Sequence, residues 1–314
     1  MSTPKLQQGD YHVPVLVREV IAFLLTEKSV TLVDATVGDG GHSLALLEAS
    51  PHIRVIGLDV DPQSLAVAQQ RLEKFKNRFL FVNGNFRHMT SLLTANGITS
   101  VDGVLADLGM SSRQIDRPER GFSYLDEGPL DLRLNPSLPQ TAAELMAALE
   151  QGELVRLLRD YGEERQARPI ARAIVQQRRR HPIRTTTDLR LIIEGVVRGP
   201  HRIKSLARVF QALRIAVNEE LQALQELLQQ AFTLLASGGR MALISYHSLE
   251  DRIVKEFFRA QALSCTCPPE FPVCVCGKQS QAVILTSKPV TPRAEELASN
   301  RRSRSAKLRV LQKR

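Results

Sequence analysis

The stretch Thr31-Leu-Val-Asp-Ala-Thr-Val-Gly-Asp-Gly-Gly-His-Ser43 decides the fold of this chain. An apolar run ends in an acidic residue, a glycine-rich turn follows, and a helical pattern continues to Ala49. Because glycine has no Cβ atom, the turn lets the backbone approach a ligand, and a helix start offers N–H groups to it. This order of strand, turn and helix predicts a ligand site at the end of the strand.

A second apolar run, Val55-Ile-Gly-Leu-Asp59-Val-Asp61, also ends in a carboxylate. In a doubly wound sheet, an acid at the end of the second strand lies where ribose hydroxyls need an acceptor. The two stretches together predict a cofactor that contains a nucleoside.

Strands and helices alternate along the first part of the chain and again near its end. The predicted strands are 31–34, 54–59, 79–82, 101–107, 240–246, 282–285 and 306–311, and the predicted helices are 13–25, 43–49, 62–75, 89–94, 217–235 and 250–263. We expect Gly238-Gly239 to end the helix before strand 240–246, and residues 291–305 to form a loop. Such alternation predicts an α/β fold, a parallel sheet with helices on both faces.

The alternation stops between residues 111 and 204, where no strand pattern is present. Helical patterns appear instead at 141–149, 152–161, 164–180 and 187–197. We therefore predict three parts: residues 1–111 and 206–314 form the sheet domain, and residues 112–205 form a helical insertion. The second part of the sheet domain carries a cysteine loop at 264–277 and a basic C-terminal segment.

Length and composition allow either one large core or one core plus a second small domain, since the chain has 314 residues and 43% hydrophobic content. No apolar run is long enough for a transmembrane helix, and the polar N-terminal residues contain no apolar segment of the signal-peptide type. These features predict a cytoplasmic protein that has no membrane partner.

The net charge of +9 is concentrated in two segments. Residues 156–184 contain nine arginines and three acids, and residues 293–314 contain eight basic residues and two acids. Clustered positive charge is typical of proteins that bind a polyanion such as RNA or DNA. The alternative is a set of solvated and paired helix faces.

All four cysteines lie in Cys265-Thr-Cys267-Pro-Pro-Glu-Phe-Pro-Val-Cys274-Val-Cys276. Two CxC pairs could hold one zinc ion as a thiolate cluster, although the usual CxxC spacing is absent. The alternative is a proline-rich loop without a metal. Four thiolates would leave no open position for catalysis, so we count no metal ligand among the functional residues.

The order Gly38-x-Gly40-Gly41 differs from the G-x-G-x-x-G pattern of dinucleotide sites, and Asp34 would lie badly beside a pyrophosphate. An acid there suits S-adenosylmethionine, which has a sulfonium and an amino-acid end. Asp107 ends a third strand at the same predicted edge. The three acids favour a methyltransferase over an oxidoreductase, and the alternative is that they only cap helices.

Longer motifs now support a family resemblance over nearly the whole chain. They are Asp34-Ala-Thr-Val-Gly-Asp-Gly-Gly-His-Ser43, Asp102-Gly-Val-Leu-Ala-Asp-Leu-Gly-Met-Ser-Ser112, Arg120-Gly-Phe-Ser-Tyr124, Gly128-Pro-Leu-Asp-Leu-Arg133, Tyr161-Gly-Glu-Glu-Arg165, Phe210-Gln-Ala-Leu-Arg-Ile-Ala-Val-Asn-Glu-Glu220, Ser245-Tyr-His-Ser-Leu-Glu-Asp-Arg-Ile-Val-Lys255 and Asn300-Arg-Arg-Ser-Arg-Ser-Ala-Lys-Leu-Arg309. The sequence resembles the RsmH or MraW family, bacterial 16S rRNA cytosine-N4 methyltransferases.

The resemblance implies a Rossmann-like class I methyltransferase core with a mostly parallel seven-stranded sheet, interrupted by an inserted helical domain for RNA recognition. It implies S-adenosyl-L-methionine as cofactor and methylation of a cytidine amine in the decoding region of 16S rRNA. The expected partner is 16S rRNA or the small ribosomal subunit. Monomer and homodimer both stay open.

The family's cofactor contacts can be transferred to matching positions of this sequence. They are Gly40, Gly41, His42, Asp59, Phe86 near the adenine, Asp107 and Gln114. The chain departs from the family pattern at three positions: Tyr246 replaces a frequent Phe, Leu132 a frequent Met, and Arg113 a frequent Pro.

The candidate catalytic residues are Asp107, Asp131 and His247, each as an acceptor for the N–H groups of the target amine. For Asp107 a pure cofactor role is an alternative, and for His247 a helix-capping role. Two other functions stay open: an RNA-binding assembly factor with little turnover, and a DNA amino-methyltransferase.

Overall fold

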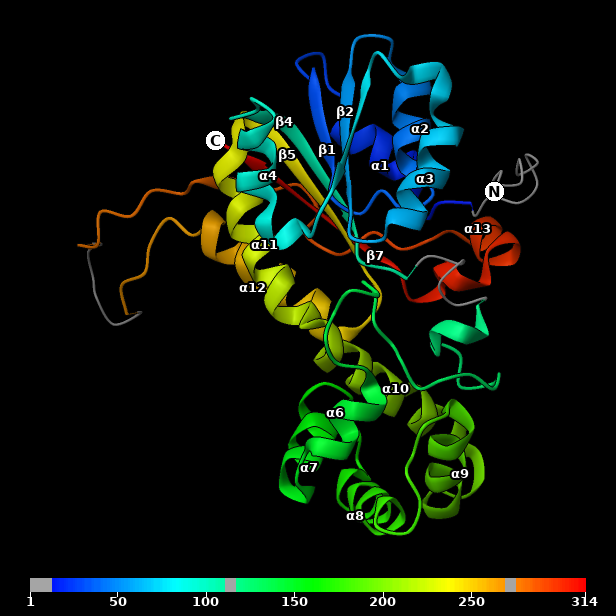
Figure 1. Cartoon of the computed structure of the whole chain (residues 1–314). Coiled ribbons are helices and arrows are strands. Elements are labelled where there is room, and N and C mark those ends of the chain that lie inside the picture. The colour runs from blue at the N-terminus through cyan, green and yellow to red at the C-terminus, as the bar shows by residue number, and fades with distance from the viewer. Residues whose placement is uncertain (1–12, 111–116, 269–274) are drawn as a thin grey trace. The chain divides into compact units, whose positions relative to one another are not determined.

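The computed structural model describes residues 13–110, 117–268 and 275–314 and divides into two compact units (Figure 1). The sheet unit contains Met1–Gly109 and Ala223–Arg314, and the helical unit contains Met110–Gln222. No helix among the described residues is long and apolar enough to cross a membrane.

One sheet of seven strands, among the described residues, forms the centre of the sheet unit. Its strands are β1 (Thr31–Asp34), β2 (Arg54–Asp59), β3 (Phe79–Asn83), β4 (Val101–Asp107), β5 (Leu235–Ser245), β6 (Ala282–Ile284) and β7 (Lys307–Lys313). Their order is β3-β2-β1-β4-β5-β7-β6, and β7 alone among them runs opposite to the other strands. The predicted α/β fold with a mostly parallel sheet is confirmed.

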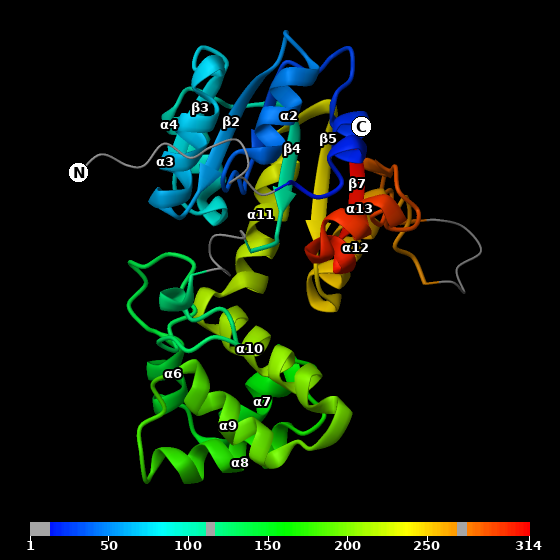
Figure 2. The same ribbon diagram turned by 90° about the vertical axis from the view of Figure 1, so that its right-hand side faces the viewer.

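Helices cover both faces of this sheet, as Figure 2 shows from the side. They are α1 (Val17–Leu24), α2 (Gly41–Ala49), α3 (Pro62–Arg71), α4 (Met89–Ala95), α11 (Glu220–Leu234) and α12 (Ser248–Ala262), whereas α13 (Ala294–Ser299) has no buried residue. Neighbouring strand residues point to opposite faces. Leu32 therefore packs in the core with α1, α2 and α3, whereas Val33 packs in the core with α4, α11 and α12.

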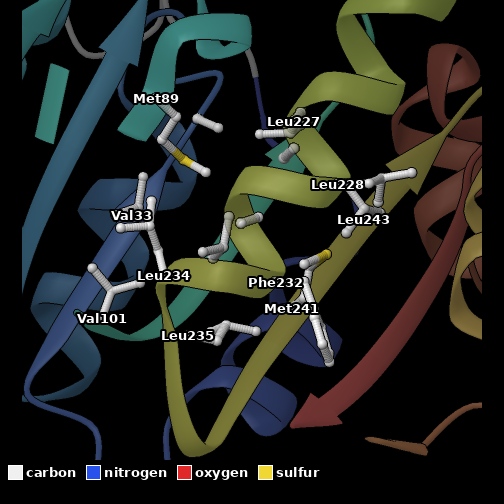
Figure 3. Close-up of a cluster of buried hydrophobic side chains, with 14 of the residues drawn as sticks. Val33, Met89, Val101, Leu227, Leu228, Phe232, Leu234, Leu235, Met241 and Leu243 are labelled. Carbon is white, nitrogen blue, oxygen red and sulfur yellow. The ribbon is translucent and has the colours of Figure 1, made fainter. Parts of the chain in front are cut away.

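The core under α11 is closely packed (Figure 3). Val33 of β1 and Met241 of β5 are at most 1% exposed, and Leu227 and Leu228 of α11 lie among them. Burial of such a side chain contributes roughly 1.5–3 kcal/mol. This packing explains why the parallel strands are nearly continuous apolar runs, because both sides of each strand are buried.

The helical unit has its own hydrophobic core. Its helices are α6 (Ala142–Ala148), α7 (Gln151–Asp160), α8 (Ala167–Arg178), α9 (Thr186–Val196) and α10 (Arg202–Asn218). Thr141 and Thr185 start α6 and α9 with capping boxes, in which the threonine and the third helical residue satisfy each other's backbone N–H groups. Short 3₁₀ helices lie at Glu73–Phe75, Phe86–His88, Pro118–Arg120, Gly199–His201 and Arg301–Ser305.

Three expectations from the sequence need correction. The range 112–205 for the insertion ends inside α10, because Leu206, Val209 and Leu213 of α10 belong to the core of the helical unit. Gly238 and Gly239 do not end a helix. They lie within β5, beside the register shift between Val101 and Gly103 of β4.

The third correction concerns residues 291–305, which were expected to form a loop. They contain α13 and the 3₁₀ helix Arg301–Ser305. The side chain of Asn300 accepts a hydrogen bond from the N–H of Arg302 and so caps the second of these helices.

A glycine in β2 tests the packing of the sheet unit. A Cβ atom on Gly57 would lie 2.9 Å from Cγ2 of Val37 and would also meet the ring of Phe79. We expect Gly57→Ala to lower the free energy of unfolding by roughly 1–3 kcal/mol, measured by thermal unfolding.

Gly195→Ala in α9 is the matched control, because nothing lies within 4 Å of its added Cβ. It should leave the melting temperature unchanged or slightly raised, since alanine favours a helix. Equal losses in the two variants would contradict this account of Gly57.

Candidate active site at the carboxyl edge of the sheet

The ends of β1, β2 and β4 meet at one edge of the sheet. The register pairs Asp34 of β1 with Gly57 of β2 and with Leu105 of β4. Because these strands are parallel, Asp34, Asp59 and Asp107 all stand at their carboxyl ends. Ligands of open α/β sheets bind outside this edge.

Asp34 holds the glycine-rich turn together. Its carboxylate is 1% exposed and accepts hydrogen bonds from the Ser43 hydroxyl, 2.7 Å, and the Thr36 N–H, 3.3 Å. Burial raises the pKa of this carboxyl above its ordinary value, while His42 and the hydrogen bond from Ser43 lower it. Asp34 therefore shapes the turn from inside rather than offering a charge at the surface.

Asp59 binds the same turn from the second strand. Its Oδ2 accepts from the N–H of Gly38 at 2.8 Å, and its Oδ1 accepts from the N–H of Asp61 at 2.9 Å. Burial raises the pKa of Asp59 to about 6, against the effect of these two hydrogen bonds. Each carboxylate oxygen has a further lone pair, so Asp59 can still accept from ribose hydroxyls.

The glycines of the turn meet a conformational and a steric requirement. Gly40 precedes α2 with φ 79°, a left-handed conformation that favours glycine, and no side chain caps this helix start. A Cβ on Gly41 would lie 3.0 Å from Cγ of Pro14. The turn therefore brings the N–H groups at the start of α2 to the ligand edge.

Asp107 is fixed in place by residues of three segments. Its backbone N–H donates to Oγ1 of Thr36 at 2.7 Å, and its Oδ1 accepts from the N–H of Gly109 at 3.2 Å. The hydroxyl of Tyr246, just after β5, lies beside this carboxylate. Burial, followed by Asp107, raises the pKa of Tyr246, so this phenol stays protonated.

His42 starts α2 and Phe86 follows β3, and their expected contacts with the cofactor stay predictions. The ring of His42 is buried, its Nε2 lies 2.8 Å from the carbonyl of Val15, and its Nδ1 lies 3.8 Å from Oδ2 of Asp107. Phe86 begins a 3₁₀ helix after β3 and is half-buried against the core under α11. Asn85 caps that short helix.

His247 caps α12. Its Nδ1 accepts from the N–H of Glu250 at 3.4 Å, and the Glu250 carboxylate accepts from the N–H groups of Tyr246 and His247. Nε2 of His247 lies 3.1 Å from Oε1 of Glu250. The capping geometry gives His247 a structural role next to the strand that carries Tyr246.

Asp131 belongs to the helical unit. Arg133 donates to both of its oxygens, at 2.7 and 2.8 Å. Although partial burial opposes them, these hydrogen bonds hold the pKa of Asp131 below its ordinary value. Gln114, expected to contact the cofactor, and Arg113, a departure from the family pattern, lie outside the described residues.

Comparisons with known proteins identify the family. Residues 10–314 match the model of the MraW methylase family. The chain belongs to this family.

Two similar relatives are both named ribosomal RNA small subunit methyltransferase H. That of Heliobacterium mobile is 49% identical, covering 96% of this chain and 99% of the relative. That of Geobacter sulfurreducens is 49% identical, covering 96% and 98%. Solved structures are more distant: a putative rRNA-methylase from Clostridium thermocellum is 14% identical, covers 95% of each chain and has a TM-score of 0.43.

S-adenosylmethionine is the cofactor of this methylase family, and the residues at the edge fit it. The Asp59 carboxylate lies at this edge, and its role as an acceptor for ribose hydroxyls stays a prediction. The uncapped start of α2 presents N–H groups beside the left-handed Gly40. Asp107 adds a second oriented carboxylate.

Sequence reasoning missed three residues that organise this edge, Thr36, Tyr246 and Glu250. The N–H of Thr36 donates to Asp34, and the Thr36 hydroxyl oxygen accepts from the N–H of Asp107. The carboxylate of Glu250, a residue that is 3% exposed, accepts from the N–H of Tyr246. Tyr246 was noted only as a departure from the family pattern. Its position at the end of a strand, like Asp107, was the available signal.

The pKa of Asp59 predicts how cofactor binding depends on pH. Ribose hydroxyls donate to the ionised carboxylate, and protonation increases as the pH falls through about 6. We expect the affinity for S-adenosylmethionine to fall by up to roughly tenfold per pH unit below that value. Calorimetric titrations across this range measure it.

Asp59→Asn is the matched variant, because its amide oxygen still accepts but does not ionise. It should bind more weakly at neutral pH and lose the dependence near pH 6, while the buried Asp34 is unchanged. An identical pH profile in both proteins would exclude Asp59 as the cause.

Proposed function

We propose that this protein methylates the N4 amine of a cytidine in the decoding region of 16S rRNA, on the small ribosomal subunit. The observation that carries the proposal is the oriented Asp107 carboxylate at the edge that also presents Asp59. The names of the relatives, which specify small-subunit ribosomal RNA, support this class of substrate. The cytidine and its N4 atom come from the family resemblance of the sequence.

Bound S-adenosylmethionine supplies an electrophilic methyl carbon on its sulfonium. The cytosine amine is a weak nucleophile because its lone pair is delocalised into the ring. A carboxylate that accepts its N–H favours a more tetrahedral nitrogen and takes up the developing positive charge. Asp107 is the acceptor we propose, since Thr36, Gly109 and Tyr246 fix its position.

The other candidates have different partners within their own units. Asp131 is paired with Arg133, and His247 caps α12. Tyr246 acts as a positioning residue in this scheme, because it touches Asp107. Phe122 is 6% exposed, and Tyr124 packs edge-on against Phe210, 5.8 Å between ring centroids, so both serve the core of the helical unit.

Exposed arginines on the helical unit offer contacts for rRNA phosphates. Arg168 and Arg172 are four residues apart on α8 and so share a face, and Arg159 of α7 joins them. Together with Gln151, Gly152, Val155 and Pro169 they line a hollow of about 540 Å³. We call Arg159, Arg168 and Arg172 the α7–α8 arginine cluster.

Other basic residues serve the fold instead. Arg178 donates to the carbonyl of Met146 at the end of α6. In the C-terminal segment, Arg309 pairs with Asp251 at 2.6 Å, and Lys313 donates to the carbonyl of Leu235 at 2.7 Å. Part of the positive charge of this segment is therefore paired within the sheet unit. We assign the RNA contact to the α7–α8 arginine cluster instead.

Substitution of Asp107 tests its proposed role. We expect Asp107→Asn to lower kcat by roughly 10²–10⁴-fold, because the amide oxygen cannot take the proton of the amine. Tyr246→Phe should lower kcat by a smaller factor, because it removes only the hydroxyl that orients Asp107. Single-turnover methylation of small subunits measures both.

Cofactor affinity is the readout that separates chemistry from binding. If the variant Asp107→Asn loses activity only because it binds S-adenosylmethionine more weakly, Asp107 serves the cofactor and is not the acceptor for the amine.

The α7–α8 arginine cluster predicts salt-dependent RNA binding. The double variant Arg168→Glu and Arg172→Glu should bind 16S rRNA at least about tenfold more weakly, with a salt slope smaller by roughly 0.7–0.9 per lost phosphate contact. Filter binding at several salt concentrations measures both. Arg259→Glu, an exposed arginine of α12, is the control, and equal losses in the two proteins would point to a general charge effect.

The reaction itself is tested by methyl transfer from labelled S-adenosylmethionine. Small subunits, free 16S rRNA and duplex DNA are offered separately, and the product nucleotide is identified by mass spectrometry. We expect one N4-methylated cytidine in the decoding region. Label on DNA would favour the DNA amino-methyltransferase, and RNA binding without cofactor binding would favour the assembly factor.

A further inference from the structure

Three cysteine sulfur atoms converge in the loop that joins α12 to β6. The Sγ atoms of Cys265, Cys267 and Cys276 all lie within 4.8 Å of one another. The loop begins and ends at one place, because the N–H of Gln281 donates to the carbonyl of Gln261 at 2.9 Å. Cys274 lies outside the described residues, and nothing below depends on it.

Backbone N–H groups point at each of these sulfur atoms. Thr266 donates to Sγ of Cys276 at 3.4 Å, and Val275 donates to Sγ of Cys267 at 3.4 Å. The N–H of Cys267 donates to Sγ of Cys265 at 3.3 Å. Such donors stabilise negative charge on sulfur, so they favour the thiolate form that binds metals.

The distance between two of the sulfur atoms matches a metal site. Sγ of Cys276 lies 3.8 Å from Sγ of Cys265. Two thiolates bound to one tetrahedral zinc at about 2.3 Å are separated by about 3.8 Å. A disulfide would need about 2.05 Å, so this pair is not one.

The backbone after the last cysteine also suits this geometry. Gly277 follows Cys276 with φ 63°, in the left-handed region that favours glycine. The backbone therefore bends at Cys276 and Gly277, where the third sulfur atom lies. No side chain of the loop residues that the structure describes belongs to a hydrophobic core cluster, so apolar packing does not hold the loop.

We propose that Cys265, Cys267 and Cys276 hold one zinc ion as thiolates, and that this ion fixes the loop between α12 and β6. Each thiol loses its proton when it binds the metal. Thiolate ligands select zinc over hard cations such as magnesium. The role we propose for the ion is structural, because it joins Cys265 and Cys267 near the start of the loop to Cys276 near its end.

Metal analysis of the purified full-length chain tests this proposal. We expect about one zinc per chain by plasma mass spectrometry, and tetrahedral thiolate absorption bands after cobalt is exchanged for zinc. Cys265→Ser and Cys276→Ser should each lose most of the metal. Thr266→Ala is the matched control, because it keeps the N–H that donates to Cys276 and should retain the metal.

A second measurement uses the unaltered chain, so that misfolding of a variant cannot decide the result. Removal of zinc by a chelator should expose the loop at 263–281 to limited proteolysis, while S-adenosylmethionine binding persists. Restored protection on addition of zinc supports the proposal. Three outcomes would overturn it: a chain purified without metal that also fails to take up zinc or cobalt, full zinc content in Cys265→Ser, or a mass two hydrogens lower that reveals a disulfide.

Discussion

The buried carboxylate of Asp34 is the interaction on which the rest of the site depends. It accepts from Thr36 in the turn and from Ser43 in α2, so it joins the end of a strand, a turn and the start of a helix. A buried carboxylate is costly unless it is hydrogen-bonded, and these bonds offset part of that cost. The glycine-rich turn can therefore take only a conformation that satisfies Asp34.

The other acids at the edge are placed through this turn. Thr36, held by Asp34, accepts from the N–H of Asp107, and Gly38 donates to Asp59. Asp59 and Asp107, which we propose as the ribose acceptor and the acceptor for the target amine, are thus linked to one buried residue. This linkage explains why three strand ends far apart in the sequence act as one site.

Much of the sheet unit could be predicted because its strands are buried on both faces. The bounds of β1, β2 and β4 follow directly from continuous apolar runs that end in Asp34, Asp59 and Asp107. Helix α10 was not predicted, since Arg202, Lys204 and Arg208 interrupt its apolar pattern. The prediction that Gly238-Gly239 ends a helix was wrong for another reason. Glycine is common both at helix ends and at irregular points in strands.

The residue types of the site could be predicted from the sequence, but the hydrogen bonds between its residues could not. Asp59, Gly40 and Gly41 follow from a strand, turn and helix pattern, whereas Thr36 and Tyr246 act through contacts with Asp107 that only the folded chain brings together. The family resemblance added His42 and Phe86. The meeting of Cys265 and Cys276 likewise could not be deduced from CxC spacing alone.

The helical unit has an independent core and its own arginine cluster, so the chain separates a cofactor-binding sheet from a basic helical surface. The central claim is that the edge of the sheet organised by Asp34 binds S-adenosylmethionine. A crystal structure of the protein with S-adenosylhomocysteine tests it most directly. The account predicts ribose hydroxyls within hydrogen-bond distance of Asp59, with the sulfur facing the edge formed by Asp107. A ligand bound elsewhere, or a ribose that does not contact Asp59, would contradict it.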